Sequence, residues 1–321
     1  MATTLWARFE QLAASLSAAQ LPAIPLDGTQ HYVARGTQGE PILLLAILPR
    51  PRVRIPLQLK NVLVEFDVAC RLYDEGGGQV EGRYLKLSCD PGSPGLHEYF
   101  VRATAGLVEA FQTPLSAEQA DHFVSNCAAL FAASAQPAKS TLIGLWGELF
   151  VIHEGRDKES LMAAWHAAPT DATDFVGKGF LEVKTTESKD RIHEVALEQV
   201  RPASGRDGYV VSVLVERTAT GCSVFELSGM IAPQLSRESE RKLWRLVAET
   251  LGTDVDTAGD VRFDVHYSRS QLRAYEARKL PAPVLQGEAL KCVSAVRYRI
   301  DFCALPWVPD GLARAEDCLR G

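Results

Sequence analysis

Asp174, Glu182 and Lys184 are the residues whose types and spacing could carry out chemistry on a bound metal ion. Carboxylate oxygens are ligands for hard divalent cations, and an ammonium group can orient a water molecule or stabilise developing charge. All three residues fall within the segment DFVGKGFLEVK. At its centre, Gly177-Lys178-Gly179 forms a short loop whose glycines can adopt positive φ, which predicts a tight β-hairpin.

The register of this hairpin decides whether the two carboxylates meet. If Val176 pairs with Phe180, Asp174 lies directly opposite Glu182, with Cβ atoms about 4.5 to 5.5 Å apart. Lys184, two residues further along the strand, falls on the same face. Facing carboxylates repel each other and destabilise the pair unless a cation lies between them. A divalent metal ion would remove that conflict.

The acid-x-Lys pattern is unspecific by itself. Independent frequencies predict about 1.2 occurrences, and the sequence has three. Glu187-Ser188-Lys189 lies in a polar loop and Glu240-Arg241-Lys242 in a helical stretch, where solvated charges are expected. Glu182-Val183-Lys184 alone lies in an apolar strand opposite another acid. Because buried charges require partners, a structural ion pair between Lys184 and one of the two acids is an equally weighted alternative.

A helix predicted at residues 140–153 could bring a third acid to the hairpin. Its apolar stripe at helical spacing is formed by Leu142, Leu145, Leu149 and Ile152. Gly144 and Gly147 cost helix stability but permit close packing on a sheet. Glu148 lies beside the stripe, from where its carboxylate could reach the hairpin. The commoner alternative is a boundary glutamate whose carboxylate extends into water.

The order of these residues resembles the PD-(D/E)XK nuclease superfamily. The likeness rests on a helix with Glu148, followed by Asp174, Glu182-Val183-Lys184-Thr185 and Gln199, and it covers about a quarter of the chain. Within the superfamily, the sequence is most similar to uncharacterised proteins found near restriction-type and phage-defence genes. Thr173 stands before the aspartate in place of proline, at a position that varies within the superfamily.

The resemblance implies a restriction-endonuclease-like core with a metal-dependent hydrolytic site. Asp174 and Glu182 would hold Mg²⁺, with Mn²⁺ as a substitute, and Lys184 would contact the attacking water. Glu148 would be an accessory acid, and Gln199 would assist the site or contact the DNA backbone. The expected function is that of a Mg²⁺-dependent DNA endonuclease of a restriction or phage-defence system. The alternative from another class is a non-catalytic DNA-binding or assembly subunit that keeps the nuclease fold.

DNA is the expected partner, although the formal net charge of −6 requires that any polyanion site be local. Gly76-Gly77-Gly78 lacks the Lys-Ser/Thr that completes a phosphate-binding loop. An ATPase or another restriction or defence subunit is therefore an expected partner, and a homodimer is compatible with the sequence. Arg50-Pro51-Arg52-Val53-Arg54 could contact a DNA backbone, but a charged edge strand explains it equally well. His193 could touch phosphate, although a structural role is commoner.

Changes of hydrophobic period place the main domain boundary near residue 135. Residues 1–135 are expected to form a β-rich α+β domain, followed by a linker at Ser134–Pro137. Its predicted helices are Thr4–Leu16, Leu96–Phe111 and Ser116–Ala133, the last opened by the capping pattern Ser116-Ala117-Glu118-Gln119. Its predicted strands include Pro41–Leu48, Leu59–Phe66 and Arg83–Leu87.

Residues 136–321 are expected to form the nuclease-like domain, with a core at about 138–235 and a C-terminal extension. Tyr209–Val215 is almost entirely apolar and predicts a strand buried on both faces. Further helices are predicted at Phe225–Leu235 and Ser239–Leu251, and late strands at Val261–Tyr267 and Ser294–Phe302. The predicted fold class is α/β, with a mixed central sheet flanked by helices and a β-rich N-terminal domain.

The composition is that of a globular protein with ample material for a core, at 46% hydrophobic and 23% charged residues. The seven cysteines lack zinc-binding or disulfide spacing, which is typical of a reducing cytosol. The longest apolar stretch is far shorter than the roughly 20 residues that a bilayer requires, and the first residues lack the order of a signal peptide. A cytoplasmic protein without a membrane segment is expected.

Overall fold

The computed structural model contains two compact units. The first comprises Met1–Lys139 and Glu240–Asp260, and the second comprises Ser140–Ser239 and Val261–Gly321. The sequence-based domains 1–135 and 136–321 stay a prediction. The structure describes residues 5–18, 20–26, 28–48, 54–73, 78–108, 114–133, 141–168, 171–202, 204–284 and 295–320.

The first unit contains a closed five-stranded β-barrel. Its strands are β1 (Gln20–Pro25), β2 (Tyr32–Arg35), β3 (Pro41–Ala46), β5 (Val62–Tyr73) and β6 (Gln79–Cys89), and the short β4 (Leu57–Leu59) extends the sheet beside β5. Neighbours follow the order β1-β2-β3-β6-β5, and a parallel pairing of β1 with β5 closes the ring. This architecture agrees with the expected β-rich N-terminal region.

Along the second half of β5 and the first half of β6, alternation places apolar side chains inside the barrel and charged ones outside. The interior cluster is formed by Leu21, Ala23, Ala34, Ile42, Leu44, Cys70, Leu72 and Tyr84. The intervening positions carry exposed ion pairs, Arg71 with Glu81 and Arg83 with Asp67, each at 2.6 Å. The barrel is therefore filled by its own side chains.

The first unit also contains helices, three of which are joined by aromatic contacts. The helical elements are α1 (Leu5–Gln11), α2 (Leu96–Val108), α3 (Ala117–Ala133), most of α8 (Arg237–Leu251), the 3₁₀ turn η2 (Gly252–Asp254) and α9 (Val255–Ala258). Tyr99 contacts Phe131 and Trp244 edge to face, and its hydroxyl donates to the Trp244 carbonyl at 3.2 Å. Ser116 and Gln119 form the predicted capping box of α3.

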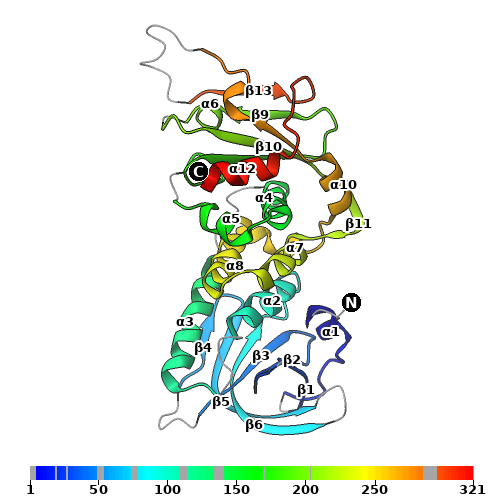
Figure 1. The fold of residues 1–321 in the computed structure, drawn as a ribbon. Coiled ribbons are helices and arrows are strands. Elements are labelled where there is room, and N and C mark those ends of the chain that lie inside the picture. Colours follow the sequence, from blue (N-terminus) through cyan, green and yellow to red (C-terminus); the bar gives the residue numbers. More distant parts are fainter. Residues whose placement is uncertain are drawn as a thin grey trace. The chain divides into compact units, whose positions relative to one another are not determined.

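A mixed four-stranded sheet forms the centre of the second unit (Figure 1). In spatial order its strands are β12 (Arg273–Glu276), β10 (Gly208–Leu214), β8 (Phe180–Thr186) and β7 (Phe175–Val176). β10 and β8 run parallel, while the two outer pairings are antiparallel. β10 is buried along almost its whole length. The predicted buried strand at 209–215 and the predicted mixed α/β fold are therefore confirmed.

Two layers cover this sheet. One contains α4 (Leu142–Glu154), α5 (Lys158–Ala164) and α12 (Gly311–Arg320), and the other contains β9 (Ile192–Ala196), α6 (Leu197–Val200) and β13 (Arg297–Asp301), as Figure 1 shows. Phe180 and Val210 of the sheet pack against the second layer. Their partners there are Val195 of β9, Ile300 of β13 and Phe302 just after β13. The other elements are β11 (Arg217–Cys222), α7 (Val224–Ile231), η1 (Ala232–Gln234), α10 (Val265–Gln271) and η3 (Ala277–Lys279).

The predicted strand at Val261–Tyr267 is wrong, because α10 begins inside it. The Asp264 carboxylate accepts a hydrogen bond from the Tyr267 N–H at 2.9 Å and so caps this helix. Phe263, just before the cap, makes isolated β-bridges to Arg217 and Cys222. The capping aspartate therefore overrides the apolar alternation that favoured a strand.

Two other predicted elements have different bounds. Thr4–Leu16 is helical only to Gln11, because the Arg35 guanidinium binds carbonyls at the helix end. Leu59–Phe66 contains a turn at Asn61, whose φ of 59° is left-handed and separates β4 from β5.

Some predicted features lie outside the described residues. These are the linker Ser134–Pro137, the glycines Gly76 and Gly77, and the Arg50–Val53 part of the basic stretch. Within the ranges that the structure describes, no helix combines the length and the apolar character that crossing a membrane would need.

Gly147 allows α4 to approach β8 closely, as the sequence predicts. A Cβ at Gly147 would overlap the Thr185 Oγ1 and lie 2.9 Å from the Thr185 Cβ. Gly147→Ala is expected to lower the free energy of unfolding by about 1–3 kcal/mol through overpacking, measured by urea denaturation. Gly144→Ala is the control, because the nearest atom to its Cβ would be Thr141 Oγ1 at 3.2 Å. Unchanged stability of Gly147→Ala would contradict this packing.

Candidate metal centre

The hairpin forms in the predicted register. Across β7 and β8, the pairs are Val176 with Phe180 and Phe175 with Leu181. Asp174 lies one residue beyond the last pair, and its Oδ2 accepts a hydrogen bond from the Val183 N–H at 2.7 Å. The Asp174 carboxylate is therefore held against the strand that carries Glu182 and Lys184.

Close backbone approach explains the two glycines of the hairpin loop. Neither Gly177 nor Gly179 has positive φ, contrary to the expectation from sequence. Instead, the N–H groups of Lys178 and Gly179 donate to the carbonyls of Leu319 at 2.9 Å and Cys318 at 3.0 Å, in the last turn of α12. A Cβ at Gly177 would lie 3.1 Å from the Leu319 carbonyl carbon. Carbonyls that a helix end leaves free thus anchor the hairpin tip.

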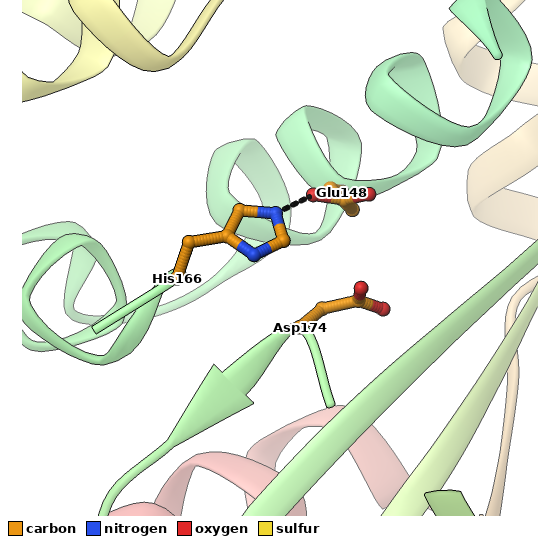
Figure 2. A group of neighbouring side chains, drawn as sticks. All are labelled: Glu148, His166 and Asp174. Atoms are coloured by element: carbon orange, nitrogen blue, oxygen red, sulfur yellow. Dashed lines mark hydrogen bonds and ion pairs between the residues drawn. The ribbon is translucent and has the colours of Figure 1, made fainter. Parts of the chain in front are cut away.

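Glu148 reaches this region from α4. The residue is 7% exposed, and its Oε2 accepts a hydrogen bond from Trp165 Nε1 at 2.7 Å and lies 2.9 Å from His166 Nε2. Figure 2 shows Glu148, His166 and Asp174 converging from a helix, a loop and the start of a strand. The buried position excludes the alternative of a glutamate extended into water.

His166 is a member of this group that sequence analysis does not predict. The ligand atoms of Glu148, His166 and Asp174 all lie within 4.8 Å of one another. The His166 N–H donates to the Asp174 carbonyl at 2.8 Å, and Trp165 forms a β-bridge with Phe175. The residues that follow α5 therefore lie beside β7. A loop that folds back in this way has no repeating pattern of apolar residues. The sequence therefore does not indicate that His166 lies close to Asp174.

Glu182, Lys184 and Gln199 form a neighbouring polar group. Lys184 Nζ lies 2.8 Å from Glu182 Oε1 and donates to Gln199 Oε1 at 2.9 Å. Gln199 Nε2 donates to the same Glu182 oxygen at 2.5 Å, and the Ala196 N–H donates to Gln199 Oε1 at 3.0 Å. The ion pair that the sequence left open is therefore present, and Gln199 holds both of its members.

The second oxygen of Glu182 has no hydrogen-bond partner among the described residues. Glu182 is 2% exposed, and its Oε2 is buried. Burial raises the pKa of Glu182 to about 7, although the charge of Lys184 lowers it. Burial also raises the pKa of Asp174 well above its usual range, and the charges of Glu182 and Glu148 raise it further. Three carboxylates thus share one region of low dielectric.

These residues fit a divalent cation. Carboxylate oxygens and imidazole nitrogens are common ligands of such ions, and a cation would relieve the repulsion among the three acids. Asp174, one of the two predicted ligands, lies with Glu148 and His166 in a group whose ligand atoms could share an ion. Glu182, the other predicted ligand, lies in the neighbouring polar group, and its charge acts on Asp174.

A pocket of about 220 Å³ lies beside the ammonium group. Lys184 and Gln199 line it, together with Glu194 and Arg297, which form an exposed ion pair at 3.3 Å. The Lys184 side chain is 18% exposed. A substrate atom could therefore reach Lys184 from this side.

His193 and Arg54 occupy positions outside this group. His193 is 4% exposed, and its Nε2 lies 2.8 Å from Ser212 Oγ, which also accepts a hydrogen bond from Arg191 at 3.0 Å. Burial lowers the pKa of His193 to about 4, which favours a neutral structural ring. Arg54 forms a two-pronged ion pair with Asp121 on the surface of the first unit.

The mixed sheet and the group of acids beside it define an α/β protein with a candidate metal centre. The chain belongs to the family described as "Putative PD-(D/E)XK family member, (DUF4420)", whose model matches residues 5–302. The resemblance to the PD-(D/E)XK superfamily is thus confirmed over nearly the whole chain, and it indicates a nuclease-type fold. No match was found among curated proteins or among solved structures.

The raised pKa of Glu182 predicts a pH dependence of stability in the absence of divalent cations. Between pH 4.5 and about 7, folded Glu182 keeps a proton that the unfolded chain has lost. The stability that this proton contributes is complete below the pKa of Glu182 in the unfolded chain. It is lost as pH rises through the pKa of Glu182 in the folded protein. From pH 5 to pH 8, the free energy of unfolding of wild type should fall by about 2–3 kcal/mol relative to Glu182→Gln, as measured with urea.

Glu198→Gln, at an exposed position on α6, is the control for this comparison. It should keep the wild-type pH dependence, because its carboxyl is in water. If Glu182→Gln shows the same pH dependence as wild type, Glu182 does not keep a proton in the folded protein.

Proposed function

We propose that this protein is a Mg²⁺-dependent DNA endonuclease with a restriction-endonuclease-like core. The observation that carries the proposal is the buried Glu182 oxygen, which has no hydrogen-bond donor in the part of the chain that the structure describes and lies in the same charged region as Asp174 and Glu148. Three acids placed together raise the free energy of ionising each one, so a purely structural role gives no reason to gather them. Membership of a PD-(D/E)XK family supports the same reaction class.

Each residue of the group has a role in this proposal. Asp174 and Glu182 bind the cation, and Glu148 is an accessory acid. When bound, Mg²⁺ would polarise the phosphodiester and lower the pKa of a water molecule. Lys184 orients the attacking water and stabilises negative charge in the transition state. Gln199 is a positioning residue, because it contacts both the ammonium and the Glu182 carboxylate.

The pocket beside Lys184 suits the approach of a nucleotide chain. Arg297 lies on its wall with a side chain that is 73% exposed, and it could exchange its ion pair with Glu194 for a contact with DNA phosphate. Such a contact would position the backbone without reading sequence. The proposal therefore needs no large basic surface, which agrees with the net charge of −6.

The biological setting that we propose is restriction or phage defence in the cytoplasm. None of the described cysteines forms a disulfide, as suits a reducing compartment. An ATPase or another defence subunit is the proposed partner for any step that consumes ATP, and a homodimer would allow cleavage of both strands. These proposals rest on the family resemblance.

Cleavage of plasmid DNA in the presence of Mg²⁺ tests the proposed reaction. Asp174→Asn keeps an acceptor for the Val183 N–H but removes a charged ligand, and Lys184→Ala removes the ammonium. Each should lower the rate of cleavage by about 100-fold or more, which is the usual scale for loss of such a group. Lys178→Ala, in the exposed hairpin loop, is the matched control and should cleave like wild type.

Equal cleavage by wild type, Asp174→Asn and Lys184→Ala would indicate a contaminating nuclease and reject this site. A wild-type protein that binds DNA but stays inactive after addition of plausible partner subunits would favour the non-catalytic DNA-binding or assembly subunit. Chelation with EDTA should abolish all activity that belongs to the site.

A further inference from the structure

His166 is held at the metal centre by its main chain. Its φ of 42° is left-handed, a region that residues with a side chain adopt uncommonly, although histidine does so more often than most, and contacts constrain its main chain there. The hydrogen bond from its N–H to the Asp174 carbonyl and the β-bridge of Trp165 with Phe175 supply that constraint. The imidazole is therefore placed before any ligand arrives.

The imidazole lies close enough to the acids to share a cation with them. His166 Nε2 is 2.9 Å from Glu148 Oε2, and His166, Glu148 and Asp174 each offer one ligand atom such that all three atoms lie within 4.8 Å of one another. Two ligand atoms with bonds of about 2.0–2.2 Å to one ion lie at most about 4.4 Å apart. Small side-chain rotations, in the arrangement that Figure 2 shows, would bring the three atoms onto one ion.

A hydrogen bond to Glu148 does not by itself account for His166. Trp165 Nε1 already donates to the same Glu148 oxygen at 2.7 Å. The His166 side chain is 37% exposed while that of Glu148 is 9% exposed, so the imidazole borders the open side of the group. An ion entering from solvent would meet this ring.

An independent observation also points to a cation here. Glu182 Oε2 is buried without a hydrogen-bond donor among the described residues. Its charge and that of Glu148 both act on Asp174, so Glu182 belongs to the same charged region as the two acids beside His166.

We propose that His166 is a nitrogen ligand of this centre and that the imidazole lets the site bind a first-row transition-metal dication more tightly than Mg²⁺. Mg²⁺ prefers octahedral oxygen ligands and keeps several waters, whereas imidazole is a ligand suited to transition metals. This inference rests on the proposed function, because it takes the site to be the metal centre of that enzyme. It keeps cleavage with Mg²⁺ and adds a difference in binding affinity, for which Mn²⁺ is the spectroscopic probe.

Binding of Mn²⁺ to the full-length protein without DNA tests this proposal. Pulsed electron paramagnetic resonance should show coupling between bound Mn²⁺ and an imidazole nitrogen in wild type. Competition between Mn²⁺ and Mg²⁺ should show tighter binding of Mn²⁺. His166→Gln keeps a donor for Glu148 but lacks the imidazole, so the nitrogen coupling should disappear and Mn²⁺ should bind about tenfold more weakly or worse.

Two further variants serve as a control and as a change of ligand type. His266→Ala removes an exposed histidine elsewhere in the second unit and should keep the nitrogen coupling and the wild-type affinity. His166→Asp changes the nitrogen ligand to an oxygen ligand and should shift the preference toward Mg²⁺. Circular dichroism checks that each variant is folded, and wild type alone already decides whether a nitrogen is bound.

Absence of nitrogen coupling in wild type, or its persistence in His166→Gln, would overturn the proposal. Equal affinity of wild type for Mn²⁺ and Mg²⁺ would also overturn it. Failure of the nuclease proposal is distinguishable, because it would leave nitrogen-coupled Mn²⁺ bound to a protein that cuts no DNA. Conversely, Mg²⁺-dependent cleavage that is equal in wild type and His166→Gln would keep the nuclease and reject the histidine ligand.

Discussion

Repulsion among Asp174, Glu182 and Glu148 is the constraint on which the second unit is organised. Each carboxylate disfavours ionisation of its neighbours, and burial increases this effect because water no longer screens the charges. The three acids come from the start of a short strand, a central strand and a helix. Packing must therefore hold these elements together against the charges that they carry.

Several local devices provide that packing. The absence of a side chain at Gly147 lets α4 lie close to Thr185 of β8. The carbonyls at the end of α12 bind the N–H groups of the hairpin loop at Lys178 and Gly179. Because helix ends always leave free carbonyls, this contact fixes the hairpin with groups that every helix supplies. The hairpin then places Asp174 beside β8 without a long strand.

Gln199 joins the charged group to the second layer of the fold. Its amide nitrogen donates to Glu182, and its amide oxygen accepts from Lys184 and from the Ala196 N–H. One side chain thus satisfies the start of α6 and fixes both members of the ion pair. In the proposed reaction, a fixed ammonium would need no reorganisation in the transition state.

The amino-acid pattern alone was enough to predict the hairpin register, and with it the placement of Asp174 near Glu182 and Lys184, because residue alternation along a strand is set by covalent spacing. It did not predict why the hairpin loop contains two glycines, nor that a helix forms where a strand was expected at 261–267. Both depend on contacts with other parts of the chain. The fold alone placed His166 beside the acids and buried the Glu182 Oε2 atom with no hydrogen-bond donor among the described residues. Those features depend on how a loop folds back and on which side chains become buried. Neither produces a repeating pattern of residues in the sequence.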